Sequence, residues 1–229
     1  MLNIIDTKKN SAKGNMQLDE TFLINLKDEA VLHFYEFEKP SLTYGYFVDI
    51  SKFINLDIVK TRDFDSARRP TGGGIVFHLW DIAFSFLMPA SHKYCFLDPL
   101  ENYKFVNSIV LNAIKSFLDK IYLSEIEYKN ENISFDSFCM AKPTKYDVIY
   151  KGKKIAGSSQ RRKKNGYLHQ SSLCLVHPDQ RFLGDILLDR EVCRAIIESS
   201  HPIFQNQDIE NNKKIIKKRI IEEFSKVLL

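Results

Sequence analysis

The chain has 229 residues, of which 44% are hydrophobic and 27% charged, a composition typical of a soluble globular protein. The net charge is only +4, and no run approaches the roughly 20 apolar residues of a membrane-spanning helix. Residues 1–15 are mixed and charged, unlike a secretory signal. The four cysteines form no CxxC pair and the histidines lack ligand spacing, so we expect neither a disulfide framework nor a metal site. These features predict a cytoplasmic protein that enters no membrane and binds no nucleic acid.

Apolar spacing and turn residues define the predicted elements. In chain order we expect a helix over residues 18–26, strands over 31–37 and 41–48, a short helix over 53–59, strands over 75–78 and 81–88, a helix over 100–121, a hairpin of 146–150 and 154–156, a strand over 167–176, and helices over 187–199 and 209–229. Gly45, inside the second strand, indicates a bulge or a close backbone approach. Because strands outnumber helices in the middle of the chain without regular alternation, the pattern favours an α+β fold with a central antiparallel or mixed sheet flanked by helices.

Residues 68–78, with the sequence RRPTGGGIVFH, form the first candidate binding site. Three consecutive glycines expose backbone N–H groups and allow a ligand to approach the main chain closely. The two arginines supply planar, charged donors that suit a phosphate or a carboxylate. No Gly-Lys-Ser/Thr sequence follows, so the segment is not a Walker loop. An anion-binding loop is one interpretation, and a mobile turn is the other.

Lys154 is the second candidate, because it enters an apolar strand just before a Gly-Ser-Ser sequence. A lysine that faces the interior is costly unless an anion accompanies it. Such an amine could stabilise charge that develops on a carbonyl oxygen or a phosphate. The alternative is a lysine at a sheet edge that discourages aggregation.

Cys139 is the third candidate. A lone cysteine is most often a small buried hydrophobic residue. Its loop position near Lys142, with Pro143 following, is also compatible with a reactive nucleophile. The residues alone leave both interpretations open.

Four segments occur together in one order: the helix start Asn15-Met16-x-x-Asp19-Glu20, the strand region 40–47, the arginine–glycine segment 68–78, and GKKIAGSSQR over residues 152–161. Together they resemble the lipoate–protein ligase and octanoyltransferase family, which shares its catalytic fold with biotin–protein ligase. The resemblance covers most of the chain, from residue 12 to residue 190. The last two segments are the specific ones.

The resemblance implies attachment of lipoyl or octanoyl groups to a specific lysine of lipoyl domains, which belong to 2-oxoacid dehydrogenases and the glycine cleavage H protein. Lys154 would contact the acyl carbonyl or acyl-phosphate oxygen, and His78 would close the end of the pocket. The residues that the resemblance implies at the substrate or cofactor are Arg68, Arg69, Thr71, Gly72, Gly73, Gly74, His78, Gly157, Ser158, Ser159 and His169.

The resemblance points to two enzymatic branches. In a ligase, ATP and Mg²⁺ first convert lipoate or octanoate to an acyl-adenylate, which the substrate lysine then attacks. In the octanoyltransferase branch a cysteine holds the acyl group as a thioester, octanoyl carrier protein is the donor, and no ATP is needed. The spacing from Cys139 to Tyr146 is similar to that branch, whereas the run of three glycines is more like the ligases. We expect the ligase, with the Cys139 transferase as the alternative and a non-catalytic module that binds a lipoyl domain or lipoyl-AMP as a third hypothesis.

The chain departs from the family pattern at two motifs. The acidic residue that the family places after the motif histidine is Leu79 here, with Asp81 two positions later. The family's His-His-Gly strand has the sequence His169-Gln170-Ser171.

The chain is expected to form one catalytic domain over residues 1–205, with an amphipathic helix over residues 206–229 packed on it and without a separate accessory domain. The basic residues 161–164 are expected at a solvated hairpin tip, or alternatively at a docking site for an acidic lipoyl domain.

Overall fold

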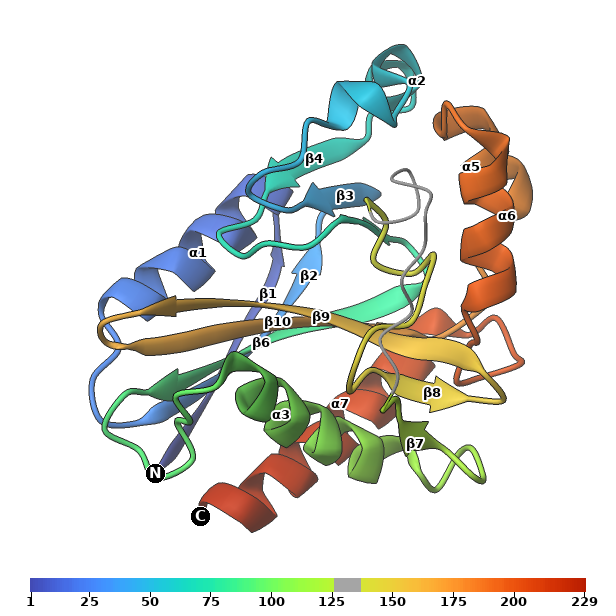
Figure 1. Cartoon of the computed structure of the whole chain (residues 1–229). Coiled ribbons are helices and arrows are strands. Elements are labelled where there is room, and N and C mark those ends of the chain that lie inside the picture. The colour runs from blue at the N-terminus through green and yellow to red at the C-terminus, as the bar shows by residue number, and fades with distance from the viewer. Residues whose placement is uncertain (126–136) are drawn as a thin grey trace.

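The computed structural model describes residues 1–125 and 137–229, and two sheets organise it (Figure 1). The larger sheet has the strand order β1 (Leu2–Asn10), β2 (Ala30–Phe37), β6 (Asp81–Pro89), β10 (Gly166–Cys174), β9 (Lys153–Lys163), β8 (Val148–Tyr150) and β7 (Tyr122–Leu123). The pair β1 and β2 is parallel and the other neighbours are antiparallel. The smaller sheet has the order β4 (Asp65–Arg68), β3 (Ser41–Tyr44) and β5 (Ile75–His78). The predicted mixed sheet is therefore confirmed.

Helices cover the larger sheet on both sides (Figure 1). One face carries α1 (Ala12–Ile24) and the smaller sheet, and the other carries α3 (Pro99–Ile114) and α7 (Ile209–Leu228). The remaining helices are a 3₁₀ turn at Ile50–Lys52, α2 (Leu56–Thr61), α5 (Gln180–Ile186) and α6 (Arg190–Ser199). In the described part of the chain, no helix has the length and apolar composition needed to cross a bilayer.

Local sequence signals explain where the two long helices that flank the sheet begin. The side chain of Ser11 caps α1 by accepting a hydrogen bond from the N–H of Gly14. Asp98 caps α3 in the same manner, and Pro99 occupies its first turn, where its missing N–H costs nothing. Each cap satisfies an N–H that has no partner inside the helix.

Aromatic and aliphatic side chains fill the layer between the sheet and the helices α3 and α7. The ring of Phe224 from α7 lies 4.7 Å from that of Phe86 and 6.2 Å from that of Phe84, both on β6. Ile216 and Ile220 of the same helix are fully buried. Period-3.6 spacing therefore gives α7 one apolar face, as the sequence predicted, and that face completes the core.

Several elements differ from the expectations. β4, β7 and α5 were not predicted, and β9 extends to Lys163 where the prediction ended at residue 156. The strand β1 is absent from the sequence prediction, and the strand expected over 41–48 ends at Tyr44. The helix expected over 100–121 ends at Ile114, and the helix expected over 53–59 is a 3₁₀ turn followed by α2. The early end of β3 has a clear cause: a Cβ atom at Gly45 would lie 1.9 Å from the carbonyl oxygen of Gly73. The predicted close backbone approach at Gly45 is thus confirmed.

Candidate functional site

Cys139 lies beside the N-terminal end of β5, where two main-chain hydrogen bonds attach its loop. The N–H of Ile75 donates to the Ser137 carbonyl oxygen at 2.7 Å, and the N–H of Cys139 donates to the Ile75 carbonyl oxygen at 3.2 Å. This pairing brings the sulfur to the glycine segment, where the N–H of Gly74 donates to Sγ at 3.2 Å. A backbone N–H thus places partial positive charge next to the cysteine sulfur.

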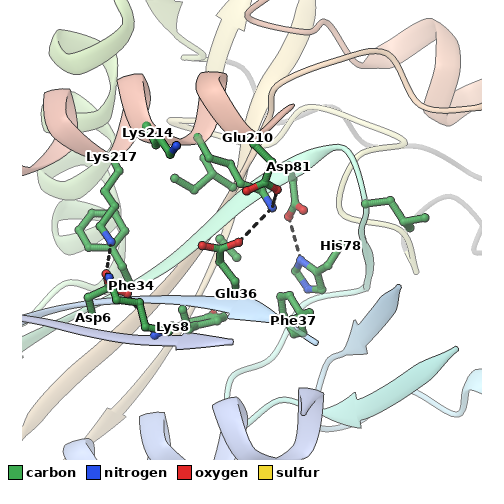
Figure 2. Close-up of a pocket in the computed structure, with 15 residues that line it drawn as sticks. Asp6, Lys8, Phe34, Glu36, Phe37, His78, Asp81, Glu210, Lys214 and Lys217 are labelled. Atoms are coloured by element: carbon green, nitrogen blue, oxygen red, sulfur yellow. Dashed lines mark hydrogen bonds and ion pairs between the residues drawn. The ribbon is translucent and has the colours of Figure 1, made fainter. Parts of the chain in front are cut away.

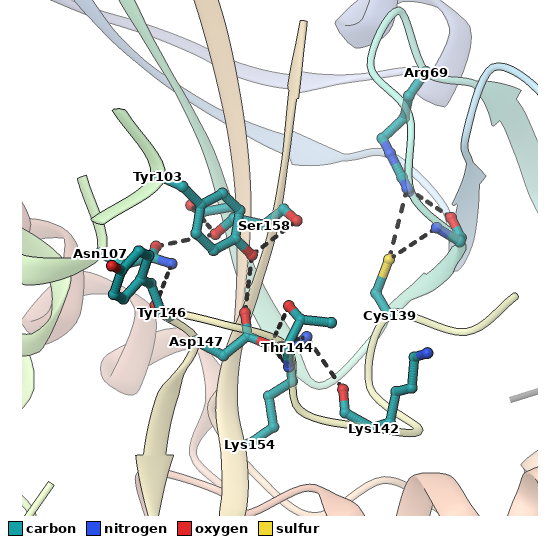
Figure 3. A network of polar contacts seen from close by, with 12 residues as sticks. Arg69, Tyr103, Asn107, Cys139, Lys142, Thr144, Tyr146, Asp147, Lys154 and Ser158 are labelled. Carbon is teal, nitrogen blue, oxygen red and sulfur yellow. Dashed lines mark hydrogen bonds and ion pairs between the residues drawn. The ribbon is translucent and has the colours of Figure 1, made fainter. Parts of the chain in front are cut away.

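The guanidinium of Arg69 fastens the glycine segment. It is 5% exposed and donates to the carbonyl oxygens of Gly72 at 3.3 Å and Gly74 at 2.6 Å, and to Thr43 on β3. One of its nitrogens also lies 3.8 Å from Cys139 Sγ (Figure 3). The arginine therefore fixes a loop that would otherwise be flexible, and it adds a permanent positive charge near the sulfur.

Lys154 of β9 is buried with a carboxylate (Figure 3). Its side chain is 3% exposed, and Nζ lies 2.7 Å from Oδ2 of the fully buried Asp147. The same carboxylate accepts hydrogen bonds from the N–H and hydroxyl of Thr144 and from the hydroxyl of Tyr103, at 2.6 to 2.8 Å. The Asp147 carboxylate thus has four hydrogen-bond or ion-pair partners, and its pairing with Lys154 offsets the cost of burying the lysine.

The amine of Lys154 lies behind Gly157, on the side of β9 next to the cysteine loop. A Cβ atom at Gly157 would lie 3.5 Å from Nζ and 3.5 Å from the sulfur of Met140. Gly157, Ser158 and Ser159 line a small cavity together with Cys139. Arg69 and His78 also border this cavity. The structure thus gathers several of the predicted site residues around one hollow, with the lysine directly behind its wall.

A chain of buried polar groups leads from α1 to this cavity. The carboxylate of Asp19 accepts from the amide of Gln170 at 2.6 Å, and the Gln170 oxygen accepts from the hydroxyl of Thr71 at 2.6 Å. Thr71 then lies 2.8 Å from the hydroxyl of Ser159. Because Thr71 has one proton and donates it to Gln170, Ser159 must donate to Thr71. The chain connects all the segments on which the resemblance rests except the strand region 40–47.

His78 borders this cavity and also a separate hollow, which Figure 2 shows. Its ring nitrogens lie 2.8 Å from Thr43 and 2.8 Å from Asp81, and the ring stacks on Phe37 at 4.2 Å. The acidic partner of His78 in this chain is therefore Asp81. That hollow has a volume of about 210 Å³ and lies under α7, and several of its charged side chains are paired, as Lys217 is with Asp6.

Lys154, Thr71 and the glycines 72–74 do not line the cavity themselves, and two further predicted residues, His169 and Arg68, lie away from it. His169 is fully buried on the α3 side of the sheet, where its ring lies 5.4 Å from that of Tyr103. Burial lowers the pKa of His169 from its ordinary 6.5 to about 3, so the ring is neutral. Arg68 is exposed on the outer side of the glycine segment, with its guanidinium 5.8 Å from the centre of the Tyr46 ring.

Other site residues were absent from the sequence-based candidates. Asp147 forms an ion pair with Lys154, and Gln170 accepts a hydrogen bond from Thr71. Tyr103 in turn donates a hydrogen bond to Asp147. Burial, together with the neighbouring Asp147 carboxylate, raises the pKa of Tyr103 well above its ordinary value, so its hydroxyl remains a donor. A buried lysine implies an anionic partner, but spacing in the chain does not identify which of the many acidic residues supplies it.

An apolar hollow borders the cysteine loop on its other side. It shares Val76 and Ser172 with the cavity at Cys139. The residues on either side of the cysteine, Phe138 and Met140, line it together with Trp80. An apolar hollow of this kind accommodates an alkyl chain better than it accommodates a polar group.

Comparisons with known proteins agree with this geometry. Residues 11–225 match the family model of the lipoyl protein ligase A/B catalytic domain. The chain is 32% identical to the octanoyltransferase LipM of Bacillus cereus over 179 residues, which are 75% of this chain but 64%, less than two thirds, of that enzyme. It is 28% identical to the octanoyltransferase LipM of Bacillus subtilis over 229 residues, which are 97% of this chain and 81% of that enzyme.

Solved structures show the same fold. A lipoate-protein ligase A bound with ATP superposes with a TM-score of 0.77 at 23% identity, over the whole of this chain and 86% of that one. A bipartite lipoate protein ligase from Thermoplasma acidophilum superposes with a TM-score of 0.72 at 23% identity, over the whole of this chain and 84% of that one. The expected α+β fold of the lipoate ligases is thereby confirmed.

Proposed function

The chain belongs to the lipoyl protein ligase A/B catalytic-domain family, and from this we propose that it transfers an octanoyl group to a specific lysine of a lipoyl domain through a thioester on Cys139. The observation that carries the proposal is the Cys139 sulfur at 3.2 Å from the Gly74 N–H, on the cavity that Gly157 and Ser159 also line. The relatives named octanoyltransferases support this transferase over the ATP-dependent ligase that the sequence analysis preferred.

The first step is a thioester exchange. The Cys139 thiolate attacks the carbonyl carbon of octanoyl carrier protein, an S–C bond forms, and the carrier's sulfur leaves with the electron pair and takes up a proton. The acyl group stays activated throughout, so this step needs no ATP. The Gly74 N–H and the Arg69 guanidinium lie where they can stabilise the sulfur as a thiolate.

The second step transfers the acyl group to nitrogen. The amine of the lipoyl-domain lysine, deprotonated on approach, attacks the Cys139 thioester. The C–N bond forms, the C–S bond breaks, and the proton lost by nitrogen restores the thiol. Both steps pass through a tetrahedral intermediate with negative charge on oxygen, which a fixed cation next to the cavity stabilises.

Lys154 is our candidate for that cation. Its Nζ atom lies 2.7 Å from Oδ2 of Asp147 and 3.5 Å from the carbonyl oxygen of Lys142. These two contacts restrict the position of the amine before substrate arrives. This preorganisation is what makes a buried charge effective in acyl transfer.

The ligase remains a competing function, with ATP as co-substrate and Mg²⁺ as its ion. The run of three glycines resembles the ligases, and Arg69 holds it in place. Over residues 1–125 and 137–229, no group of three or more His, Cys, Asp and Glu side chains is arranged to hold a metal ion. We therefore assign no residue to Mg²⁺ and derive no step through it.

Intact-protein mass spectrometry tests the proposal. Purified protein mixed with octanoyl carrier protein, without ATP, is expected to gain the mass of one octanoyl group and to lose it when an apo lipoyl domain is added. Cys139→Ser is expected to gain none, whereas Cys95→Ser, which alters a half-buried thiol outside the cavity, is expected to react like the wild type.

Two outcomes would contradict the transferase. Pyrophosphate release with lipoate and ATP, retained in Cys139→Ser, would establish the ligase. Failure to modify any lipoyl domain under either condition would leave the non-catalytic binding module. Modification of the lipoyl domain that depends on Cys139 and not on ATP supports the proposal.

A further inference from the structure

A basic groove lies on the outer side of the arginine–glycine segment, facing α1. Its volume is about 350 Å³, and its charged lining consists of Lys13, Arg68, Arg69, Arg161 and one acidic residue, Glu20. Cations thus outnumber anions four to one on this surface. The groove and the cavity at Cys139 share Arg69, so the same guanidinium lies between the groove and the reactive sulfur.

The four cations of the groove differ in their surroundings. Arg161 lies 3.4 Å from Glu20 and donates to the carbonyl oxygen of Pro70 at 3.0 Å. Arg69 is buried in the loop. Lys13 and Arg68 are exposed, and among the described residues neither lies within ion-pair distance of a carboxylate. Among the described residues, Lys13 and Arg68 are therefore the two cations of the groove that are both exposed and without a carboxylate partner.

An aromatic residue holds the arginines in position. The ring of Tyr46 lies 5.8 Å from the guanidinium carbon of Arg68 and 5.5 Å from that of Arg161, so it contacts both cations. The N–H of Tyr46 donates to the Thr71 carbonyl oxygen at 3.0 Å, which attaches the aromatic residue to the loop. Its neighbour Phe47 is 91% exposed. Exposed aromatic side chains next to arginines are typical of the centre of a protein–protein contact.

We infer that this groove docks the acyl carrier protein that delivers the octanoyl group, an acidic partner whose thioester is carried on a phosphodiester-linked arm. The inference rests on the proposed function. Arg68 and Lys13 supply unpaired cations for the acidic surface of the partner and for the phosphodiester, and guanidinium groups suit phosphate geometry. The lipoyl domain, the other protein substrate, offers a bare lysine without a phosphate, so the phosphate chemistry of the groove favours the donor.

The test compares two donors in the formation of the acyl-enzyme. The variant Lys13→Gln/Arg68→Gln removes both unpaired cations from exposed positions. With octanoyl carrier protein at low ionic strength, we expect kcat/KM to fall on the order of 10-fold, because electrostatic attraction speeds association by at least this much. With octanoyl-pantetheine, which has neither the acidic protein nor the phosphate, the loss is expected to be clearly smaller. Added salt should narrow the gap between the variant and the wild type.

A matched control removes the same charge elsewhere. Lys214→Gln/Lys218→Gln neutralises two exposed lysines on α7, on the opposite face of the larger sheet, and is expected to leave acylation by the carrier protein unchanged. Equal rates for the groove variant and the wild type would overturn the docking site. Equal losses with both donors, or a loss confined to transfer onto the lipoyl domain, would overturn it as well. Failure of the wild type itself to accept octanoyl from the carrier protein would identify the proposed function as the part that is wrong.

Discussion

The buried amine of Lys154 has both a structural and a catalytic role in this proposal, and a substitution tests each. Lys154→Ala leaves the carboxylate of Asp147 buried without its counter-ion. We expect the free energy of unfolding to fall by about 3–5 kcal/mol, because an unpaired buried charge is costly. We also expect the acyl-transfer rate to fall by about 10² to 10³, since one electrostatic donor is lost. Thermal unfolding and single-turnover transfer measure the two effects.

A second variant separates the two roles of Lys154. Lys154→Ala/Asp147→Asn removes the orphaned charge, so the melting temperature should recover while the rate stays low. Lys153→Ala changes the preceding, partly exposed lysine of the same strand and should leave both nearly as in the wild type. Recovery of the rate together with the stability would show that the lysine is only structural.

The sequence identifies candidate functional residues better than it identifies the residues that they contact. A lysine within an apolar strand and a cysteine in a basic loop are unusual enough to be noticed one at a time. Their partners are not: Thr71 and Gln170 are 99 positions apart, and Asp19 and Gln170 are 151 apart. Such contacts arise only when the sheet brings distant segments together, and nothing local in the sequence encodes them.

The loop of three glycines depends on a fourth glycine at the end of β3. In Gly45→Ala the new methyl group would lie 1.9 Å from the Gly73 carbonyl oxygen, a backbone atom that a side chain cannot displace without moving the loop. We expect this variant to form the acyl-enzyme at least about 10-fold more slowly, because small displacements of positioned groups cost this much. Gly184→Ala on α5, where a methyl group meets no atom within 4 Å, is the control. Rapid acylation in Gly45→Ala would show that the loop position is unimportant.

The buried hydrogen-bond chain from α1 makes a second prediction about the same loop. Thr71→Val keeps the shape of the side chain but removes the hydroxyl that joins Gln170 to Ser159. The loss of a buried hydrogen bond costs about 1–3 kcal/mol. We expect the loop to lose its order and kcat to fall, with little change in KM for the carrier protein. Thr71→Ser restores the hydroxyl and should recover most of kcat, whereas a kcat that is low in both variants would show that the methyl group matters instead.

Strands with a clear apolar or alternating sequence pattern were predicted well. Elements whose position depends on pairing with a distant segment were not. The alternating and apolar patterns of β2, β5, β6 and β10 locate those strands to within about two residues. The strand β1 has charged and polar residues over half its length and lies parallel to β2 at the sheet edge. Its backbone pairs with a strand about 28 positions later, which no local pattern indicates. The periodic apolar residues that suggested a helix as far as residue 121 continue beyond the last helical hydrogen bonds of α3 at Ile114.

The larger sheet separates the candidate site on its α1 face from the core on its α3 face, and β10 contributes side chains to both. On β10, Gln170 faces α1 and the glycine loop, whereas His169 faces α3. Because successive side chains of a strand point to opposite faces, neighbouring residues of one motif serve different roles. The motif histidine is therefore part of the core beneath the site, while the glutamine beside it holds the site together.

This placement of His169 predicts how the stability of the whole fold depends on pH. Burial lowers the pKa of His169 from 6.5 to about 3. In the unfolded chain this ring is therefore protonated below pH 6.5, whereas in the native protein it stays neutral down to about pH 3. The unfolded state therefore binds more protons across this interval, and stability must fall as the pH drops from 6.5 towards 3. His169→Gln has no such group, so its melting temperature should decline less steeply over that interval than that of the wild type. His177→Gln, which changes an exposed histidine, should keep the wild-type slope. Equal slopes for His169→Gln and the wild type, measured by calorimetry, would show that the buried ring takes up its proton without unfolding the protein.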